Sequence, residues 1–135
     1  MIPILYTPNE TVFSNNGIGT LSETLSCYVT EERNGAFELE FTYPIAGRLY
    51  SYIETDCIVK AKANETSDLQ LFRIYKHSKP INGIVTFNAE HISYELSKNP
   101  IEEVTVLNAN AQTALNAVLS AGLLEHNFTA QSDID

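Results

Sequence analysis

The sequence predicts a mainly β (α+β) protein, with an antiparallel β-barrel or sandwich followed by one amphipathic helix. Six or so short runs of alternating apolar and polar residues occupy the first hundred positions, which is typical of half-buried strands. Asn-Gly dipeptides at 34–35 and 82–83 each separate two such runs. The apolar period then changes once, near residue 100, to that of an α-helix.

The first predicted element is a β-hairpin over residues 24–43. Asn34-Gly35 lies between its two halves and favours a type I′ turn, because Asn and Gly tolerate positive φ. We expect Cys27 to be buried, since it alternates in step with its apolar neighbours. The apolar positions are Leu25, Cys27 and Val29 in the first strand and Phe37, Leu39, Phe41 and Tyr43 in the second.

Further strands are expected on both sides of this hairpin. Asn82-Gly83 predicts a second hairpin that joins residues 69–76 to residues 84–91. Lys60 and Lys62 define the solvent side of another strand. The remaining candidate strands are residues 2–6, 56–63 and 104–107.

The helix is predicted near residues 109–121. Its apolar side chains follow the i, i+3, i+4, i+7, i+8 spacing of one helical face, with Asn108 or Asn110 as N-cap and Gly122 as C-cap. Residues 125–130 are a candidate for one more strand. Because the period changes and no Lys or Arg follows Lys98, we place a boundary near residue 100, with a β-barrel domain over 1–100 and the start of a second domain over 101–135.

The overall charge restricts the class of partner. Lys and Arg number 8 against 17 Asp and Glu, for a net charge of −9, so nucleic acid and anionic membranes are poor partners. No apolar run approaches the roughly 20 residues of a membrane span, and the N-terminus lacks the features of a signal peptide. We therefore expect a protein that is neither inserted into a membrane nor exported by that route.

No pattern of metal ligands or cofactor-binding residues occurs. The histidines and cysteines, His77, His91, His126, Cys27 and Cys57, fall on different predicted elements without the short spacings of metal sites. Gly17 and Gly19 lack the further Gly and the Lys of phosphate-binding loops. Cys27 and Cys57 are expected to be free thiols, with a single disulfide as the alternative.

Two alternative hypotheses, one catalytic and one of carbohydrate binding, each depend on a few residues. His91 and Ser93 would share one face of a strand, which allows a small serine hydrolase, but no oxyanion motif accompanies them. Tyr43, Tyr50 and Tyr52 lie close in the sequence and allow a carbohydrate-binding β module. A structural hydrogen bond in the first case, and sheet or interface positions in the second, are the simpler expectations.

The chain resembles the N-terminal hub region of phage tail proteins known as tail-associated lysins, prophage tail endopeptidases or phage minor structural proteins. The resemblance runs the whole chain and depends on the order of its pieces. These are Ile4-Leu5-Tyr6, Asn16-Gly17-Ile18-Gly19 with Leu21-Ser22, residues 27–35, residues 43–47, Phe72-Arg73-Ile74 and residues 89–96.

The family is similar to the central hub protein of contractile-tail baseplates. The resemblance implies a structural component of the virion's tail tip, made in the bacterial cytoplasm, whose barrel domains form a trimer beneath the distal tail protein. It also implies that the helix near 109–121 opens the next hub domain and that lytic domains lie downstream. We therefore expect no enzyme activity and no catalytic, cofactor or metal residue here, and a monomeric or weakly self-associating chain.

Overall fold

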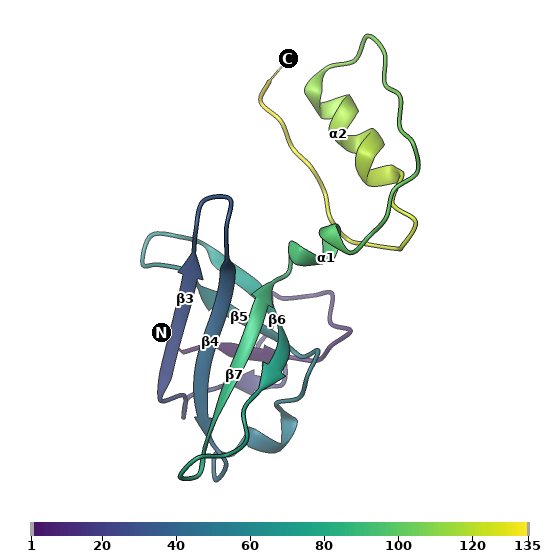
Figure 1. Ribbon diagram of the computed structural model, residues 1–135. Coiled ribbons are helices and arrows are strands. Elements are labelled where there is room, and N and C mark those ends of the chain that lie inside the picture. The colour runs from purple at the N-terminus through teal and green to yellow at the C-terminus, as the bar shows by residue number, and fades with distance from the viewer. Residues whose placement is uncertain (1, 135) are drawn as a thin grey trace. The chain divides into compact units, whose positions relative to one another are not determined.

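The computed structural model describes residues 2–134 and confirms the mainly β fold. Seven strands form one antiparallel sheet in the order β2-β1-β5-β6-β7-β4-β3, which curls into a half-barrel (Figure 1). The strands are β1 (Ile4–Tyr6), β2 (Gly19–Thr20), β3 (Ser26–Glu31), β4 (Phe37–Pro44), β5 (Ile58–Lys62), β6 (Leu69–His77) and β7 (Ile84–His91). The helices are η1 (Tyr50–Tyr52, 3₁₀), α1 (Tyr94–Ser97) and α2 (Ala111–Ser120).

The chain divides into two compact units, Met1–Ile92 and Ser93–Asp135. The sheet lies entirely in the first unit, whereas α1 and α2 lie in the second. The division falls where β7 ends, earlier than the boundary expected near residue 100. The short helix α1, at the start of the second unit, has too few residues to produce a periodic signal in the sequence.

The first hairpin forms, but its predicted type I′ turn is wrong. The Gly35 N–H donates to the Glu32 carbonyl (3.0 Å), so the turn centres on Arg33 and Asn34. Asn34 has φ of 59°, whereas Gly35 is not among the residues with positive φ. A three-residue loop therefore joins the strands, closed by a bond from the Glu32 N–H to the Ala36 carbonyl (2.8 Å).

The second hairpin has the expected two-residue turn. Asn82 and Gly83 have φ of 50° and 76°, which are the two positive values that a type I′ turn requires. Ile81 and Ile84 exchange backbone hydrogen bonds of 2.9 and 3.0 Å across this turn. The register then shifts between Ile74 and Lys76, where Tyr75 lies in a bulge of β6.

The core of the first unit lies on the inner face of the curled sheet. Phe41 of β4 and Phe87 of β7 are directly paired, and their rings stack with centroids 5.0 Å apart. The buried cluster contains Leu5, Leu21, Leu39, Phe41, Tyr43, Leu49, Ile53, Cys57, Val59, Ala61, Phe72, Ile74, Val85, Phe87 and Ala89. These residues include most of the alternating positions of the sequence pattern.

Charged side chains of β5 and β6 bind the connection between β1 and β2. The Lys60 ammonium donates to the Phe13 carbonyl (2.6 Å), and the Arg73 guanidinium donates to the carbonyls of Pro8 (3.1 Å) and Asp56 (2.8 Å). Lys60 is therefore half-buried and bonded, although the sequence placed it on the solvent side of its strand.

The second unit contains the predicted helix, which begins and ends close to the expected residues. The Asn110 side chain caps it by accepting from the Thr113 N–H (2.9 Å). The C-cap is Ala121 and not Gly122; the φ of Gly122 is not positive, so no left-handed glycine ends this helix. No helix of residues 2–134 is long and apolar enough to cross a membrane.

The two strands expected in the second unit are absent from its described residues. Residues 104–107 alternate between apolar and polar side chains, but they pair with no other strand in the described part of the chain. Residues 125–130 run beside α2 (Figure 1), and no strand pairs with them in the described part of the chain. The Gln112 amide donates to the Ala130 carbonyl (2.9 Å) and accepts from the Ser132 N–H (2.8 Å).

Candidate functional site

His91, the first candidate for catalysis, is a structural residue at the end of β7. Its ring stacks on Phe37, with centroids 4.1 Å apart, and meets Phe72 edge-on at 5.5 Å. Its Nε2 is 3.1 Å from the Gln70 amide oxygen. Burial lowers the pKa of His91, and the nearby Glu31 carboxylate opposes this effect.

Ser93 does not continue the strand of His91. It has helical backbone angles (φ −60°, ψ −21°) and stands at the N-cap position of α1, in the second unit. The expectation that both side chains share one face of a strand is therefore wrong, because β7 ends at His91. The serine hydrolase hypothesis depended on His91 and Ser93 lying on one face of a strand, and that arrangement is absent.

Cys27 and Cys57 are both free thiols. Cys57 belongs to the buried core, whereas Cys27 is only half-buried on the edge strand β3. The expectation that Cys27 is buried is wrong, because β3 has a neighbour on one side alone and Leu25 beside it is 60% exposed. Burial raises the pKa of both thiols, which keeps them protonated and weakly nucleophilic.

The three neighbouring tyrosines do not form one exposed platform. Tyr43 is fully buried, Tyr50 is half-buried and Tyr52 is exposed. The Tyr43 hydroxyl donates to a Glu23 carboxylate oxygen (2.9 Å), so it is committed to the fold. Tyr43 is therefore not exposed to bind a carbohydrate, and the hypothesis of a binding surface made of all three tyrosines is not supported.

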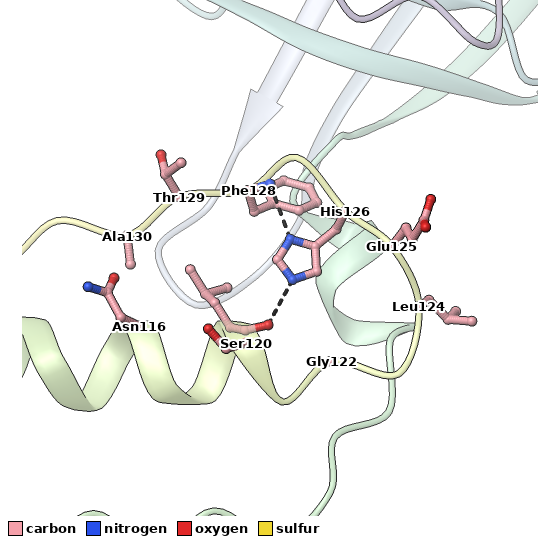
Figure 2. Close-up of a pocket in the computed structure, with 10 residues that line it drawn as sticks. Asn116, Ser120, Gly122, Leu124, Glu125, His126, Phe128, Thr129 and Ala130 are labelled. Atoms are coloured by element: carbon pink, nitrogen blue, oxygen red, sulfur yellow. Dashed lines mark hydrogen bonds between the residues drawn. The ribbon is translucent and has the colours of Figure 1, made fainter.

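A cavity of the second unit, with a volume of about 580 Å³, lies between α2 and the segment after it (Figure 2). Asn116 and Ser120 of α2 and His126 and Phe128 of the segment line it. The Glu125 side chain is drawn pointing away from the helix. The lining therefore combines amide, hydroxyl and aromatic groups.

His126 is occupied on both ring nitrogens. Nδ1 accepts from the Phe128 N–H (3.2 Å), so the proton lies on Nε2, which donates to the Leu119 carbonyl (2.9 Å). A histidine bonded in this way has neither a free base nor a free donor for chemistry in the cavity. Among residues 2–134, no group of three or more His, Cys, Asp or Glu is placed to hold a metal ion.

The second unit has no hydrophobic core of its own among its described residues. None of residues 93–134 is buried, and α2 leaves Leu115 41% and Val118 43% exposed. The other exposed large apolar residues of this unit are Leu96, Ile101, Leu107, Leu123, Leu124 and Ile134. An apolar cavity of about 250 Å³ lies among Leu96, Ile101, Val118 and Leu119.

The outer face of the sheet is acidic and aromatic. Glu38 of β4 lies directly opposite Glu90 of β7, and the Tyr75 hydroxyl donates to Glu38 (3.3 Å). Burial and the nearby Glu38 raise the pKa of Tyr75. Tyr28, on the edge strand β3, is 67% exposed. The sequence indicated these residues only as the polar half of each strand.

Comparisons with protein-family models, curated proteins and solved structures found no match.

Proposed function

We propose that this chain is an assembly module of a phage tail tip: the N-terminal hub region of a tail-associated lysin-type protein that docks to the distal tail protein. In this role it is a virion component, it forms a trimer in the full-length protein, and it contributes no catalytic residue. The resemblance of the sequence to phage tail hub proteins is the reason for proposing an assembly role.

The observation that carries the proposal is the uncovered apolar surface of the second unit. Leu107 is 80% and Leu123 58% exposed, in a unit whose described residues include none that is buried. Leu96, Ile101 and Val118, which are also exposed, line one apolar cavity, and contiguous exposed apolar surface marks interaction sites in soluble proteins. A segment of this kind gains most of its stability when another protein surface covers it.

The first unit supports the same role in a different way. Its core is complete, and its histidine, cysteine and buried tyrosine side chains are engaged in packing or hydrogen bonds. These side chains thus stabilise the unit itself and are not available for catalysis. Its outer face offers Glu38, Glu40 and Tyr28 for contact.

The test is complex formation with the distal tail protein of the same phage, measured by size-exclusion chromatography with light scattering. We expect the parent chain to form a complex and the Leu107→Glu and Leu123→Glu variants to weaken it. Ile81→Glu is the matched control, because Ile81 is 71% exposed but lies in the first unit.

Absence of a complex at every concentration would overturn the docking role. If Ile81→Glu abolished the complex and the second-unit variants did not, the first unit would be the docking surface. Turnover of host cell-wall peptide that is lost in His91→Ala would overturn the non-catalytic assignment.

A further inference from the structure

The chain contains three Asn-Gly dipeptides, at Asn16-Gly17, Asn34-Gly35 and Asn82-Gly83. In such a pair the glycine backbone nitrogen attacks the Asn Cγ carbon, a new C–N bond closes a succinimide ring, and the side-chain nitrogen leaves as ammonia. Water then opens either carbonyl of the ring and gives aspartate or isoaspartate. No oxidant, reductant or enzyme is needed.

All three Asn side chains are exposed, so solvent access does not distinguish them. The state of the attacking N–H does. A bonded N–H must first break its hydrogen bond, and the net stability of such a bond corresponds to a factor of about two to ten in an equilibrium.

The first two dipeptides have a committed glycine N–H. The Gly17 N–H donates to the Asn15 side-chain oxygen (2.8 Å), and a Cβ on Gly17 would lie 2.4 Å from the Leu5 carbonyl oxygen, which shows how closely this backbone is packed. The Gly35 N–H donates to the Glu32 carbonyl (3.0 Å). Both glycine N–H groups are therefore engaged in hydrogen bonds within the fold.

The third dipeptide differs. In the type I′ turn at Asn82-Gly83, the cross-turn bonds belong to Ile81 and Ile84, and the Gly83 carbonyl accepts from the Ile45 N–H (2.9 Å). Within residues 2–134 the Gly83 N–H has no hydrogen-bond acceptor. The space around Gly83 is also open, since the nearest atom to an added Cβ is Ile45 Cγ1 at 3.9 Å.

We propose that Asn82 is a spontaneous modification site of the folded protein, where succinimide formation gives aspartate and isoaspartate, and that the fold protects Asn16 and Asn34. Conversion to aspartate adds one negative charge to the net charge of −9. Isoaspartate also adds one backbone carbon to a two-residue turn, which disturbs the pairing of Ile81 with Ile84. This inference is independent of the proposed assembly role.

The test is peptide mapping by mass spectrometry after incubation at neutral to mildly alkaline pH, in the native protein and in guanidinium. In guanidinium we expect similar rates at all three sites, because each Asn precedes Gly. In the native protein we expect residue 82 to convert about two- to tenfold faster than residues 16 and 34, which is the factor that one hydrogen bond to the glycine N–H contributes. Equal native rates, or protection of Asn82, would overturn the proposal.

The role of the N–H bond is tested at Asn15. Asn15→Ala removes the acceptor of the Gly17 N–H and should accelerate conversion at Asn16, whereas Asn15→Asp keeps an acceptor oxygen and should not. The rate at Asn82 serves as an internal reference for both variants. No acceleration at Asn16, or equal acceleration at Asn82, would show that hydrogen bonding of the glycine N–H does not control these sites.

Discussion

At the scale of single residues, Tyr43 connects the core to two segments outside the sheet. Its ring is fully buried, its hydroxyl donates to Glu23 (2.9 Å), and the Leu49 N–H donates to the same hydroxyl oxygen (3.4 Å). A Cβ on Gly47 would lie 2.4 Å from Tyr43 Cε1, so the ring also requires a glycine there. The bonds to Arg48 N–H and to Tyr43 lower the pKa of Glu23.

Tyr43→Phe should lower the free energy of unfolding by about 1 kcal/mol, because it removes the hydroxyl bonds and leaves the ring in place. Guanidinium unfolding measures the change. Tyr52→Phe is the matched control, since Tyr52 is 56% exposed, and it should leave stability unchanged. Equal effects in both variants would contradict a role for the Tyr43 hydroxyl.

His91 predicts a pH dependence. Burial against Phe37 and Phe72 lowers its pKa from 6.5, while Glu31 opposes the shift. The unfolded chain therefore takes up this proton at a higher pH than the folded one. The stability that the neutral ring contributes is present above about pH 6.5 and is lost as the pH falls toward the lowered pKa.

We expect the parent to lose more stability between pH 7.5 and pH 5.5 than the His91→Gln variant, measured as free energies of unfolding in guanidinium. His77→Gln removes an exposed imidazole and should follow the parent. If parent and His91→Gln had the same pH dependence, His91 would not be the titrating group.

At the scale of elements, the same dipeptide makes two different turns. The inner residues of β3 and β4 are all odd-numbered, and Cys27 pairs with Phe41 and Val29 with Leu39. Odd residues pair with odd residues only if an odd number of residues separates the strands. A two-residue turn at Asn34-Gly35 would place inner residues opposite outer ones, so the three-residue loop follows from burial of the inner face.

Glycine substitutions separate backbone strain from steric overlap. Gly17 and Gly83 both have positive φ, of 54° and 76°, where a residue with a Cβ loses about 1–2 kcal/mol. Gly83→Ala should cost about that amount, because its Cβ meets open space. Gly17→Ala should cost more, since its Cβ would overlap the Leu5 carbonyl oxygen and the Tyr6 ring.

Thermal and guanidinium unfolding of both variants measure these costs. Equal losses would show that the connection between β1 and β2 moves away from the added methyl group. A neutral Gly83→Ala would mean that the turn at 82–83 adopts another form.

At the scale of the whole molecule, stability is distributed unequally. Among residues 2–134, every buried residue lies between Pro3 and Ala89, whereas polar bonds connect the parts of the second unit. Asn99, for example, donates to the Leu124 carbonyl and accepts from the Leu124 N–H, both at 2.9 Å. Exposed hydrogen bonds of this kind add little net stability without apolar burial.

A chain shortened to residues 1–92 should therefore fold cooperatively. We expect its midpoint of thermal unfolding to lie within about 4–8 °C of the parent, which corresponds to roughly 1 kcal/mol in a domain of this size. Residues 93–135 alone should show no cooperative transition by circular dichroism. A cooperative transition of that segment would contradict the view that it depends on a covering surface.

Much of the fold could be predicted from local signals. β7 matches its predicted range, and β6 and α2 begin or end within two residues of theirs. The Asn110 cap was one of two predicted alternatives. The candidate site was far less predictable, because the strand alternation that supported pairing His91 with Ser93 ends at His91, and nothing local marks that end.

The sequence by itself determined the fold class, the inner residues of the hairpins and the helix, because each depends on a short-range period or on the backbone freedom of Asn and Gly. Only the tertiary structure decided how far Cys27 is buried and that residues 104–107 and 125–130 are not strands. These outcomes depend on neighbours that are distant in the sequence. A strand needs a partner to bond its backbone, and burial needs a second surface, so neither is encoded in the segment itself.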